Sequence, residues 1–464
     1  MITHGFQPVL LWTDACFFLL LLAFGIGIVH AWRRPHLRRS WARVGERAAG
    51  MAAMVVLSVF LLVGILDSLH FRAALPPAEG QTDTVYATEV TSVLDVLMRA
   101  QREDVERTYS APLATHAYVK ETVELPGGGQ RRDFPRLEYG GAHLADPATD
   151  HASGITRRLL VGAAVGAGLS VAGALGLGVL VGGVRRLLLG QTRLAWRSAW
   201  VTGSILAIAA GMLVSLAQGY HVFGTDKVGQ DVLYQVLKSL RTALVIGLVP
   251  TLVTLPIGVV LGLAAGYFRG KVDDAIQYVY TTVSAIPGVL LIAAAVLSIQ
   301  VMLDNHPEWF ATAVERGDVR LLSLCIILGM TSWTGIARLL RGESLKMREY
   351  EYVQAARAFG VSAGRILLRH ILPNVFPIIL ITMVMEFSTL VLAEAVLSYI
   401  GIGVDPTMFS FGLMINNARM ELSREPVVWW TLTAAFIFMV VLVLAANILA
   451  DAVRDALDPR SERQ

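Results

Sequence analysis

Hydrophobic residues are grouped into runs of membrane-spanning length, separated mostly by short polar loops. A transmembrane helix needs about 20 mainly apolar residues, because it rises about 1.5 Å per residue across a hydrocarbon layer about 30 Å thick. Nine segments meet this requirement, at residues 9–31, 50–70, 159–182, 197–218, 241–267, 277–303, 319–340, 375–400 and 428–450. The pattern predicts an all-α polytopic membrane protein with about nine transmembrane helices. The first run is expected to be retained as a span, because no Lys or Arg precedes it as in a signal peptide.

Composition agrees with this interpretation. Hydrophobic residues make up 55% of the 464 residues and charged residues only 16%, against about a quarter in soluble chains. The net charge of +3 is explained by basic loops on one side of a membrane. The expected partner is therefore a lipid bilayer, and binding to nucleic acid is not expected. Cys16 and Cys325 fall inside apolar runs, which argues against a disulfide or a metal site.

Arginine-rich loops give the orientation. Residues 32–47 contain one Glu and six arginines, namely Arg33, Arg34, Arg38, Arg39, Arg43 and Arg47. Basic residues also collect at 185–197 and 341–369. All three loops are cytoplasmic if the N-terminus is outside and the C-terminus inside, as nine spans require. Arg157 and Arg158 are the exception, since they lie outside in this arrangement.

The polar segment 71–156 is expected outside the membrane as a small extracytoplasmic α+β insert. Residues 89–107 predict an amphipathic helix, whose apolar face carries Val90, Val93, Leu94 and Leu97. A hairpin is predicted from Tyr118–Leu125 and Arg131–Tyr139, with a turn at Pro126–Gly129. A disordered segment is the alternative. Beyond the insert, the span 159–182 has a small residue at every fourth position, which lets another helix approach closely.

The most informative loop runs from Glu349 to Asn374. It predicts a short helix, a break at Gly360, a second short helix and a new span that opens at Pro373. Proline is tolerated in the first turn of a helix, because its missing N–H would be unpaired there in any case. Ala355 and Ala356 leave little bulk on the first helix, so a partner can come close.

This loop resembles the coupling loop, or EAA loop, of ABC importer permeases. The family pattern appears as Gln354-Ala355-Ala356, Gly360 and His370-Ile-Leu372-Pro373; Gln354 replaces the acid and His370 an apolar residue. In that family the loop docks on an ATPase and transmits its closure. The resemblance implies an ATPase-coupling role for Glu351, Gln354, Ala355, Ala356, Gly360, Arg365, His370, Leu372 and Pro373.

A second segment, 221–231, resembles a periplasmic loop of the dipeptide/oligopeptide/nickel branch of the same family, with departures at Val222 and Gln230. The resemblance implies a loop that faces a substrate-binding protein, with His221, Gly224, Thr225, Asp226, Gly229 and Asp231. A metal site at the histidine and the two aspartates is the alternative. Residues 392–403 and 447–460 also resemble segments of this branch.

The resemblance covers about residues 197–460 and implies a six-helix ABC permease core at 195–464, with a cytoplasmic coupling loop at 342–374. Before it we expect an extension with two spans (1–70), the insert (71–156), and a third extra span with a linker (157–194). The implied partners are a second homologous permease subunit, two cytoplasmic ABC ATPase subunits and an extracytoplasmic substrate-binding protein. The implied location is the bacterial inner membrane, and the implied cargo is peptides, similar small solutes or nickel chelates.

No catalytic or cofactor site is expected on this chain. A phosphate-binding loop needs Gly-x4-Gly-Lys-Ser/Thr, and the nearest match, Gly266 to Val272, is one residue short and lacks the hydroxyl. ATP and Mg²⁺ are therefore expected on the partner ATPases. No metal-ligand cluster at zinc spacing is present in the sequence.

Glu386 and Glu394 lie inside the span 375–400. Ionisable groups are costly in a membrane, so these two are expected to face the bundle interior or a water-filled path. One interpretation is a polar lining of the translocation path. The alternatives are a buried pair with Arg338 or Arg341, or contact with a partner permease.

Two other classes of function remain open. A secondary transporter or channel independent of ATPase subunits would show paired broken spans, repeated in two halves, and the sequence shows no such repeat. An interaction or sensory protein with the insert as receptor would leave the segment Gln354–Gly360 unexplained.

Overall fold

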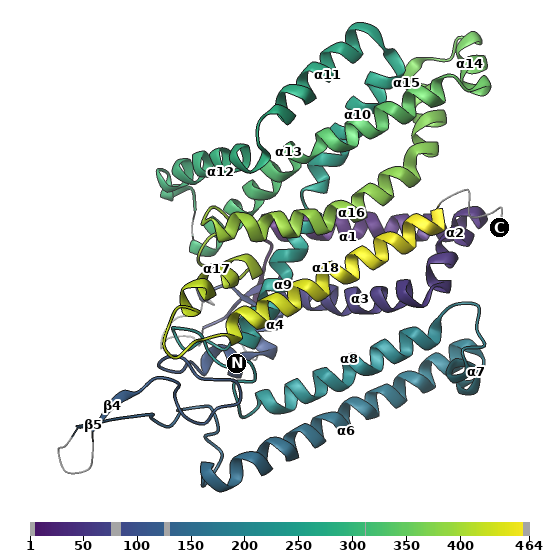
Figure 1. The fold of residues 1–464 in the computed structure, drawn as a ribbon. Coiled ribbons are helices and arrows are strands. Elements are labelled where there is room, and N and C mark those ends of the chain that lie inside the picture. Colours follow the sequence, from purple (N-terminus) through teal and green to yellow (C-terminus); the bar gives the residue numbers. More distant parts are fainter. Residues whose placement is uncertain (1–4, 76–84, 125–129, 311, 458–464) are drawn as a thin grey trace. The chain divides into compact units, whose positions relative to one another are not determined.

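The computed structural model describes residues 5–75, 85–124, 130–310 and 312–457 (Figure 1). Within this part, 8 helices are long and apolar enough to cross a membrane, and a bent pair of helices raises the number to 9 if the pair is one span. The predicted polytopic all-α fold with about nine spans is confirmed. The chain divides into two units, each described by itself: unit 1 is Met1–Leu10, Arg34–Ala243 and Phe409–Ala456, and unit 2 is Leu11–Arg33, Leu244–Met408 and Leu457–Gln464.

Unit 2 is built from long helices joined by short ones. The long helices are α1 (Trp12–Arg33), α10 (Thr251–Phe268), α13 (Ala313–Arg348) and α16 (Leu372–Tyr399); the others are α11 (Gly270–Ala285), α12 (Gly288–Asp304), η1 (Pro307–Trp309), α14 (Glu351–Ala358), α15 (Ala363–Ile366) and η2 (Leu367–Ile371). The first of them, α1, packs by its N-terminal turn, because the Thr13 N–H donates to the buried Asp318 carboxylate at 3.1 Å.

Three glycines at every fourth position bring α10 and α13 into close contact. An added Cβ would lie 2.1 Å from Ile336 Cγ2 at Gly258, 2.6 Å from the Ala337 carbonyl at Gly262, and 2.5 Å from the Arg341 carbonyl at Gly266. A small-residue stripe of this kind lets two membrane helices approach to backbone contact. The pair α10 and α13 therefore forms a closely packed scaffold, which the predicted coupling loop follows at the end of α13.

The predicted continuous span at 277–303 is wrong in its shape. α11 and α12 occupy this stretch, but they are bent by 84° at the break between them. Pro287 follows α11 and precedes α12. The cause is local, since a proline disfavours helical geometry at the preceding residue and cannot donate its own N–H.

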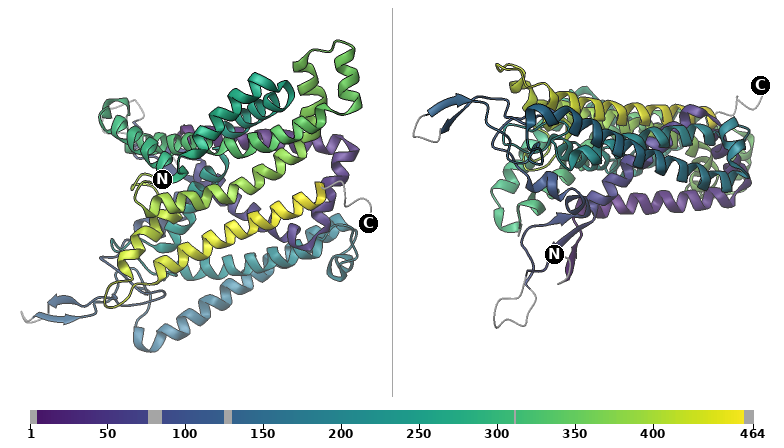
Figure 2. Two further views of the ribbon diagram at one scale, coloured as in Figure 1. Left: turned by 45° about the horizontal axis from the view of Figure 1, so that its top comes forward. Right: turned by 90° about the horizontal axis from the view of Figure 1, so that it is seen from below.

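Unit 1 contains the remaining long helices. They are α3 (Ala48–Ser68), α6 (Pro147–Val181), α8 (Trp196–Ala217), most of α9 (Val232–Leu248) and most of α18 (Trp430–Leu457), with the shorter α2 (Pro35–Glu46), α7 (Val184–Leu189) and α17 (Phe411–Glu421). α6 and α8 lie side by side (Figures 1 and 2). An added Cβ at Gly162 would be 2.4 Å from the Gly211 carbonyl, and one at Gly166 would be 2.4 Å from Ile208 Cα. The small residues in α6 thus permit the close approach that the sequence predicts.

The insert contains strands and short helices, so the predicted α+β character is confirmed. Strands β2 (His70–Ala73) and β3 (Thr91–Ser92) form an antiparallel sheet with β1 (Phe6–Val9), which precedes the insert, in the order β1-β2-β3. Within the insert, β4 (Glu121–Glu124) pairs with β5 (Gln130–Asp133). The hairpin is shorter than predicted, and its turn at Pro126–Gly129 lies outside the described residues.

The single amphipathic helix predicted at 89–107 is wrong. Two short helices occupy this stretch, α4 (Val93–Leu97) and α5 (Arg99–Glu103). A capping box between Ser92 and Asp95 starts α4, because each side chain accepts a backbone N–H of the other residue. The predicted apolar face is only partly buried, since Leu94 is buried whereas Leu97 is 66% exposed. The helix breaks at Met98, so the residues of α5 no longer share a face with those of α4.

Candidate functional site

The predicted coupling loop forms a helical hairpin that we call the knuckle, residues Glu349–Asn374. It runs from the end of α13 through α14, a turn, α15 and η2 into α16. Gly360 sits in the turn with φ +76°, a left-handed conformation that favours glycine. The Val361 N–H donates to the Ala356 carbonyl at 3.1 Å and closes α14. The predicted order of helix, break and helix is therefore present.

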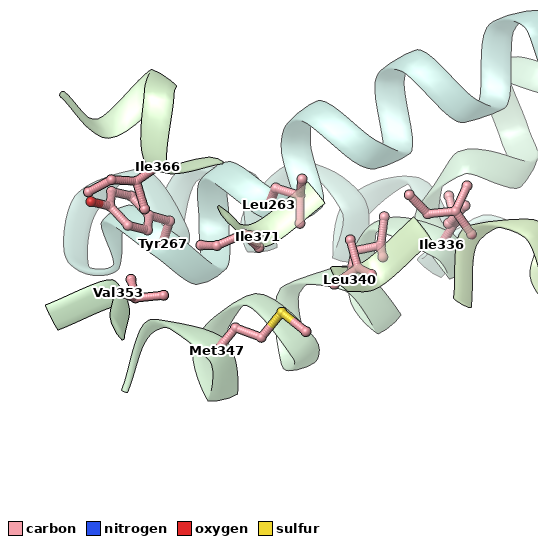
Figure 3. Close-up of a cluster of buried hydrophobic side chains, with 10 residues drawn as sticks. Leu263, Tyr267, Ile336, Leu340, Met347, Val353, Ile366 and Ile371 are labelled. Carbon is pink, nitrogen blue, oxygen red and sulfur yellow. The ribbon is translucent and has the colours of Figure 1, made fainter. Parts of the chain in front are cut away.

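A cluster of buried hydrophobic side chains fixes the knuckle to the scaffold (Figure 3). Val353 of α14, Ile366 of α15 and Ile371 of η2 belong to this cluster. They are joined there by Leu263, Tyr267, Ile336, Leu340, Met347, Val375 and Ile379. Residues of the loop and of three long helices thus share one core, so a force applied to α14 reaches the ends of α10, α13 and α16.

Polar contacts hold the base of the knuckle. Arg348 donates to the Tyr267 carbonyl at 2.8 Å, and Arg269 pairs with Glu349 at 2.5 Å. The Gln354 amide donates to the Glu349 carbonyl at 3.2 Å. Gln354, the residue that replaces the acid of the family pattern, therefore bonds within the loop. An open hollow of about 430 Å³ lies beside these groups and is lined by Tyr267, Arg348, Glu349, Val353, Gln354, Arg357 and Ala358.

The other predicted coupling residues lie mostly at the surface of the knuckle. Glu351, Ala355, Gly360, Arg365 and Pro373 are exposed, whereas Ala356, His370 and Leu372 are half-buried. Phe359, which was not among the residues predicted from the sequence, is 86% exposed beside Gly360. The sequence signal for it was an aromatic residue directly before the glycine of the predicted break. A large exposed aromatic side chain of this kind is typical of a protein-binding surface.

The two acidic residues of α16 have different environments. Glu394 is 2% exposed and accepts a hydrogen bond from the Ser398 hydroxyl at 2.6 Å. Glu386 is half-buried, and no hydrogen bond or ion pair within the described residues engages its carboxylate. The alternative of pairing with Arg338 or Arg341 is wrong, since Arg341 binds Asp273 at 2.6 Å and Arg338 lies over the Tyr280 ring.

In unit 1, the loop 221–231 is covered by the insert. The His221 ring lies between two carboxylates, with Nδ1 2.8 Å from Asp231 and Nε2 3.4 Å from Glu106 of the insert. Glu106 also accepts three backbone N–H groups, from Glu138, Tyr139 and Gly140, at 2.9–3.0 Å. All three charged side chains are buried, with 5% or less of their surface exposed.

The contacts around His221 shift its own pKa and that of Glu106. Burial by itself would lower the pKa of His221, but contacts with Asp231 and Glu106 outweigh it and raise the pKa to about 9. Burial would raise the pKa of Glu106, but His221 and the three backbone N–H donors outweigh it and lower the pKa to about 2. A buried ion pair, in which Glu106 also accepts three backbone N–H groups, therefore joins the insert to the loop.

Backbone contacts run along the same boundary. The Glu106 N–H donates to the Gly229 carbonyl, the Thr225 N–H to the Ser110 carbonyl, and the Leu113 N–H to the His221 carbonyl, at 2.9–3.1 Å. Gly224 and Gly229 have φ of +72° and +79°. A Cβ at Gly229 would lie 1.7 Å from the Glu106 carbonyl. The insert approaches the loop so closely that only glycine fits there.

The remaining loop residues organise the turn itself. Asp226 accepts the backbone N–H groups of Val228 and Gln230, both at 2.9 Å, and Asp231 accepts that of Leu233 at 2.8 Å. The described residues contain no group of three or more His, Cys, Asp or Glu side chains placed to hold a metal ion. The outward-facing part of the loop is Lys227 and Val228, which are exposed.

A second ionic cluster anchors the insert to the helices of unit 1. Lys238 of α9 pairs with Asp67 of α3 at 2.7 Å and with Asp95 of α4 at 3.0 Å. The Tyr234 hydroxyl also donates to Asp95, at 2.8 Å. The insert is thus fixed to the rest of unit 1 at two separate places.

Comparison with known proteins identifies the class. Residues 258–463 match the family described as "Binding-protein-dependent transport system inner membrane component". The dipeptide transport system permease protein DppC of Bacillus subtilis is 30% identical over 243 residues, which is 52% of this chain and 70% of that protein. The chain belongs to this family of ABC importer permeases, and it is a multi-pass protein of the bacterial inner membrane.

Other relatives carry related names. The oligopeptide transport system permease protein OppC of Mycobacterium tuberculosis (strain ATCC 25618 / H37Rv) is 31% identical, over 52% of this chain and 76% of that protein. A putative peptide transport system permease protein of Brucella suis is 34% identical, over 52% of this chain and 74% of that protein. Family members are permease subunits, and the resemblance that the sequence analysis drew from the knuckle is confirmed.

Proposed function

We propose that this chain imports peptides or similar small solutes as one permease subunit of an ATP-driven transporter. The observation that carries the proposal is the knuckle, whose exposed α14 and Phe359 stand on a core shared with three long helices. A partner that moves α14 moves these helices with it, which is what alternating access requires. The names of the relatives supply the cargo class.

The energy source is proposed to lie on other chains. Two cytoplasmic ABC ATPase subunits would bind ATP and Mg²⁺ and dock on the knuckle of this chain and of a second, homologous permease subunit. The hollow beside Arg348 and Gln354 is a place where a side chain of the ATPase would fit. Glu386, which is half-buried and has no hydrogen-bond or ion-pair partner among the described residues, is proposed to line the path or to meet the second permease.

The proposed domain organisation keeps the boundaries derived from the sequence. Residues 195–464 form the permease core with a coupling loop at 342–374, and the family match at 258–463 falls within it. Residues 1–70, 71–156 and 157–194 are an N-terminal extension, the insert, and a further span with its linker.

The extracytoplasmic substrate-binding protein is proposed to meet the insert together with the loop 221–231. His221, Thr225 and Asp231 are buried there, so their role in docking would be to position the exposed Lys227 and Val228 and the insert above them. A binding protein that approaches this part of unit 1 meets the insert first.

Reconstitution tests the proposal. The complete complex would be assembled in liposomes with its ATPases, its second permease and its binding protein, and ATP-dependent peptide uptake would be measured. Phe359→Ser should reduce uptake and ATPase association together, because it removes the exposed aromatic side chain of the knuckle.

The matched control is Phe134→Ser, which removes an exposed phenylalanine (44%) of the insert. This variant should leave ATPase association unchanged. Uptake that proceeds without ATPase subunits would favour the secondary transporter instead, and equal loss in both variants would remove the special role of the knuckle.

A further inference from the structure

Two arginine-rich segments lie at one end of unit 1. Residues 34–47 include five arginines and one glutamate, and residues 184–197 include four arginines and no acidic residue. The first segment forms α2 and its junction with α3, and the second forms α7 and the link to α8. Figure 1 shows α2 and α7 near the same ends of α3, α6 and α8.

Direct contacts join the two segments into one surface. The Ala195 N–H donates to the Gly45 carbonyl at 2.8 Å, and Arg193 donates to Glu46 at 2.9 Å. The Ser198 hydroxyl adds a third bond, to the Ala48 carbonyl at 2.7 Å. The contact between Arg193 and Glu46 neutralises Glu46, the only acidic residue of the two segments. We call the joined surface the basic face, residues 34–47 and 184–197.

Most of its positive charge is unpaired. Arg47 pairs with Asp455 and Arg193 with Glu46. The guanidinium groups of five others are exposed, and no hydrogen bond or ion pair within the described residues engages them: Arg34, Arg38, Arg185, Arg186 and Arg197. The field of these five charges is therefore available to a partner outside the chain.

Apolar side chains accompany the charges on α7, which follows a helix long and apolar enough to span the membrane. α7 begins three residues after the membrane-spanning α6 ends, and α8 begins seven residues after α7 ends. Leu187 of α7 is buried against the protein, whereas Leu188 and Leu189 are 45% and 53% exposed next to Arg185 and Arg186. A short helix with exposed leucines and arginines, at the end of a span, is suited to the boundary between lipid headgroups and acyl chains.

We propose that the basic face binds anionic phospholipid headgroups of the bilayer, with the phosphates on the unpaired arginines and the acyl chains against Leu188 and Leu189. An acidic protein surface would account for the charge, but it would leave the two leucines without a use. Arginine suits phosphate because its planar guanidinium donates two parallel hydrogen bonds. The proposal concerns lipid contact and does not depend on the transported solute.

The test uses the full chain in nanodiscs with equal amounts of phosphatidylglycerol and phosphatidylethanolamine. Native mass spectrometry after release from the disc gives the ratio of the two retained lipids. The native chain should be enriched in phosphatidylglycerol, and R185Q/R186Q should lose enrichment by up to roughly 30-fold at low ionic strength, since each cation near a membrane contributes about fivefold. Lysine at both positions should keep most of it.

The matched control is R131Q/R132Q, which removes two exposed arginines from β5 of the insert. Enrichment should not change in this variant. Equal loss in both variants would mean a net-charge effect, and no loss in either would mean that the basic face has no lipid preference; each result overturns the proposal.

Two further arms separate other sources of negative charge. Millimolar inorganic phosphate that displaces phosphatidylglycerol as well as high NaCl does would identify free phosphate as the ligand and refute the lipid site. If R185Q/R186Q keeps its lipid but loses ATPase association, the basic face serves a protein partner, which also refutes it. Thermal unfolding should be unchanged in R185Q/R186Q, because both side chains are exposed and unpaired.

Discussion

The ion pair between the insert and the loop 221–231 predicts a stability that depends on pH. The pKa of His221 is raised to about 9 from its ordinary 6.5 by Asp231 and Glu106. A raised pKa means that the folded state holds the proton more tightly than the unfolded state does. The stabilisation is therefore complete below pH 6.5 and is lost as the pH rises through 9.

The size of this stabilisation follows from the shift in the pKa of His221. One pKa unit corresponds to about 1.4 kcal/mol, so a shift from 6.5 to about 9 corresponds to about 3 kcal/mol. A free energy of this size changes the equilibrium constant for opening the contact by a factor on the order of 100. Glu106 contributes nothing to the change in this window, because its pKa of about 2 keeps it ionised throughout.

The assay is hydrogen–deuterium exchange of the backbone amides that close this boundary, those of Glu106 and Leu113. Measured between pH 6.5 and 9.5 and corrected for the intrinsic exchange rate, their protection should fall by up to about 100-fold. His221→Gln removes the titrating group, so its protection should be lower at pH 6.5 and nearly constant over the range. An equal pH slope in the native chain and in His221→Gln would refute the reasoning.

Three further predictions concern unit 2. Gly360→Leu should reduce substrate-stimulated ATPase activity of the reconstituted complex, since a left-handed φ of +76° costs a branched side chain about 1–3 kcal/mol; Gly360→Asn should retain more activity, and equal activity of all three proteins would contradict a role for the turn. Gly262→Ala should lower the thermal midpoint, because its Cβ would lie 2.6 Å from the Ala337 carbonyl, whereas Gly335→Ala on α13 has open space and should not; equal midpoints would disprove the close packing. Glu386→Gln should change uptake with little loss of stability, whereas Glu394→Leu should destabilise by about 1–3 kcal/mol, because the Ser398 hydroxyl loses its buried acceptor; a destabilised Glu386→Gln would point to a structural role instead.

The break at Pro287 shows which features of a span hydropathy predicts and which it does not. Hydropathy merges 277–303 into one run because it counts only apolar character, while the proline inside that run carried the signal for the 84° bend. The spans themselves were predictable because lipid imposes the same length and polarity on each of them. The stripe Gly258, Gly262 and Gly266 was equally visible, although its partner α13 was not.

The residues of the knuckle also divide into those whose role was predictable from the sequence and those whose role was not. Gly360 was readable from the sequence, because a break between two short helices needs a residue that tolerates positive φ. The exposure of Phe359 was not readable, since whether a loop side chain is buried depends on the elements that pack around it. Its 86% exposure follows from Val353, Ile366 and Ile371, which fill the shared core and leave the turn outside it.

The sequence by itself determined the membrane class, the number of apolar spans, the basic ends of the helices and the order of elements in the knuckle, since each depends on neighbouring residues and on the solvent around them. Only the tertiary structure decided that the insert covers the loop 221–231 and that Glu106 lies against His221. These contacts join residues far apart in the chain, and no local periodicity records such a pairing. Which surfaces are buried is a property of packing, and packing depends on all the elements at once.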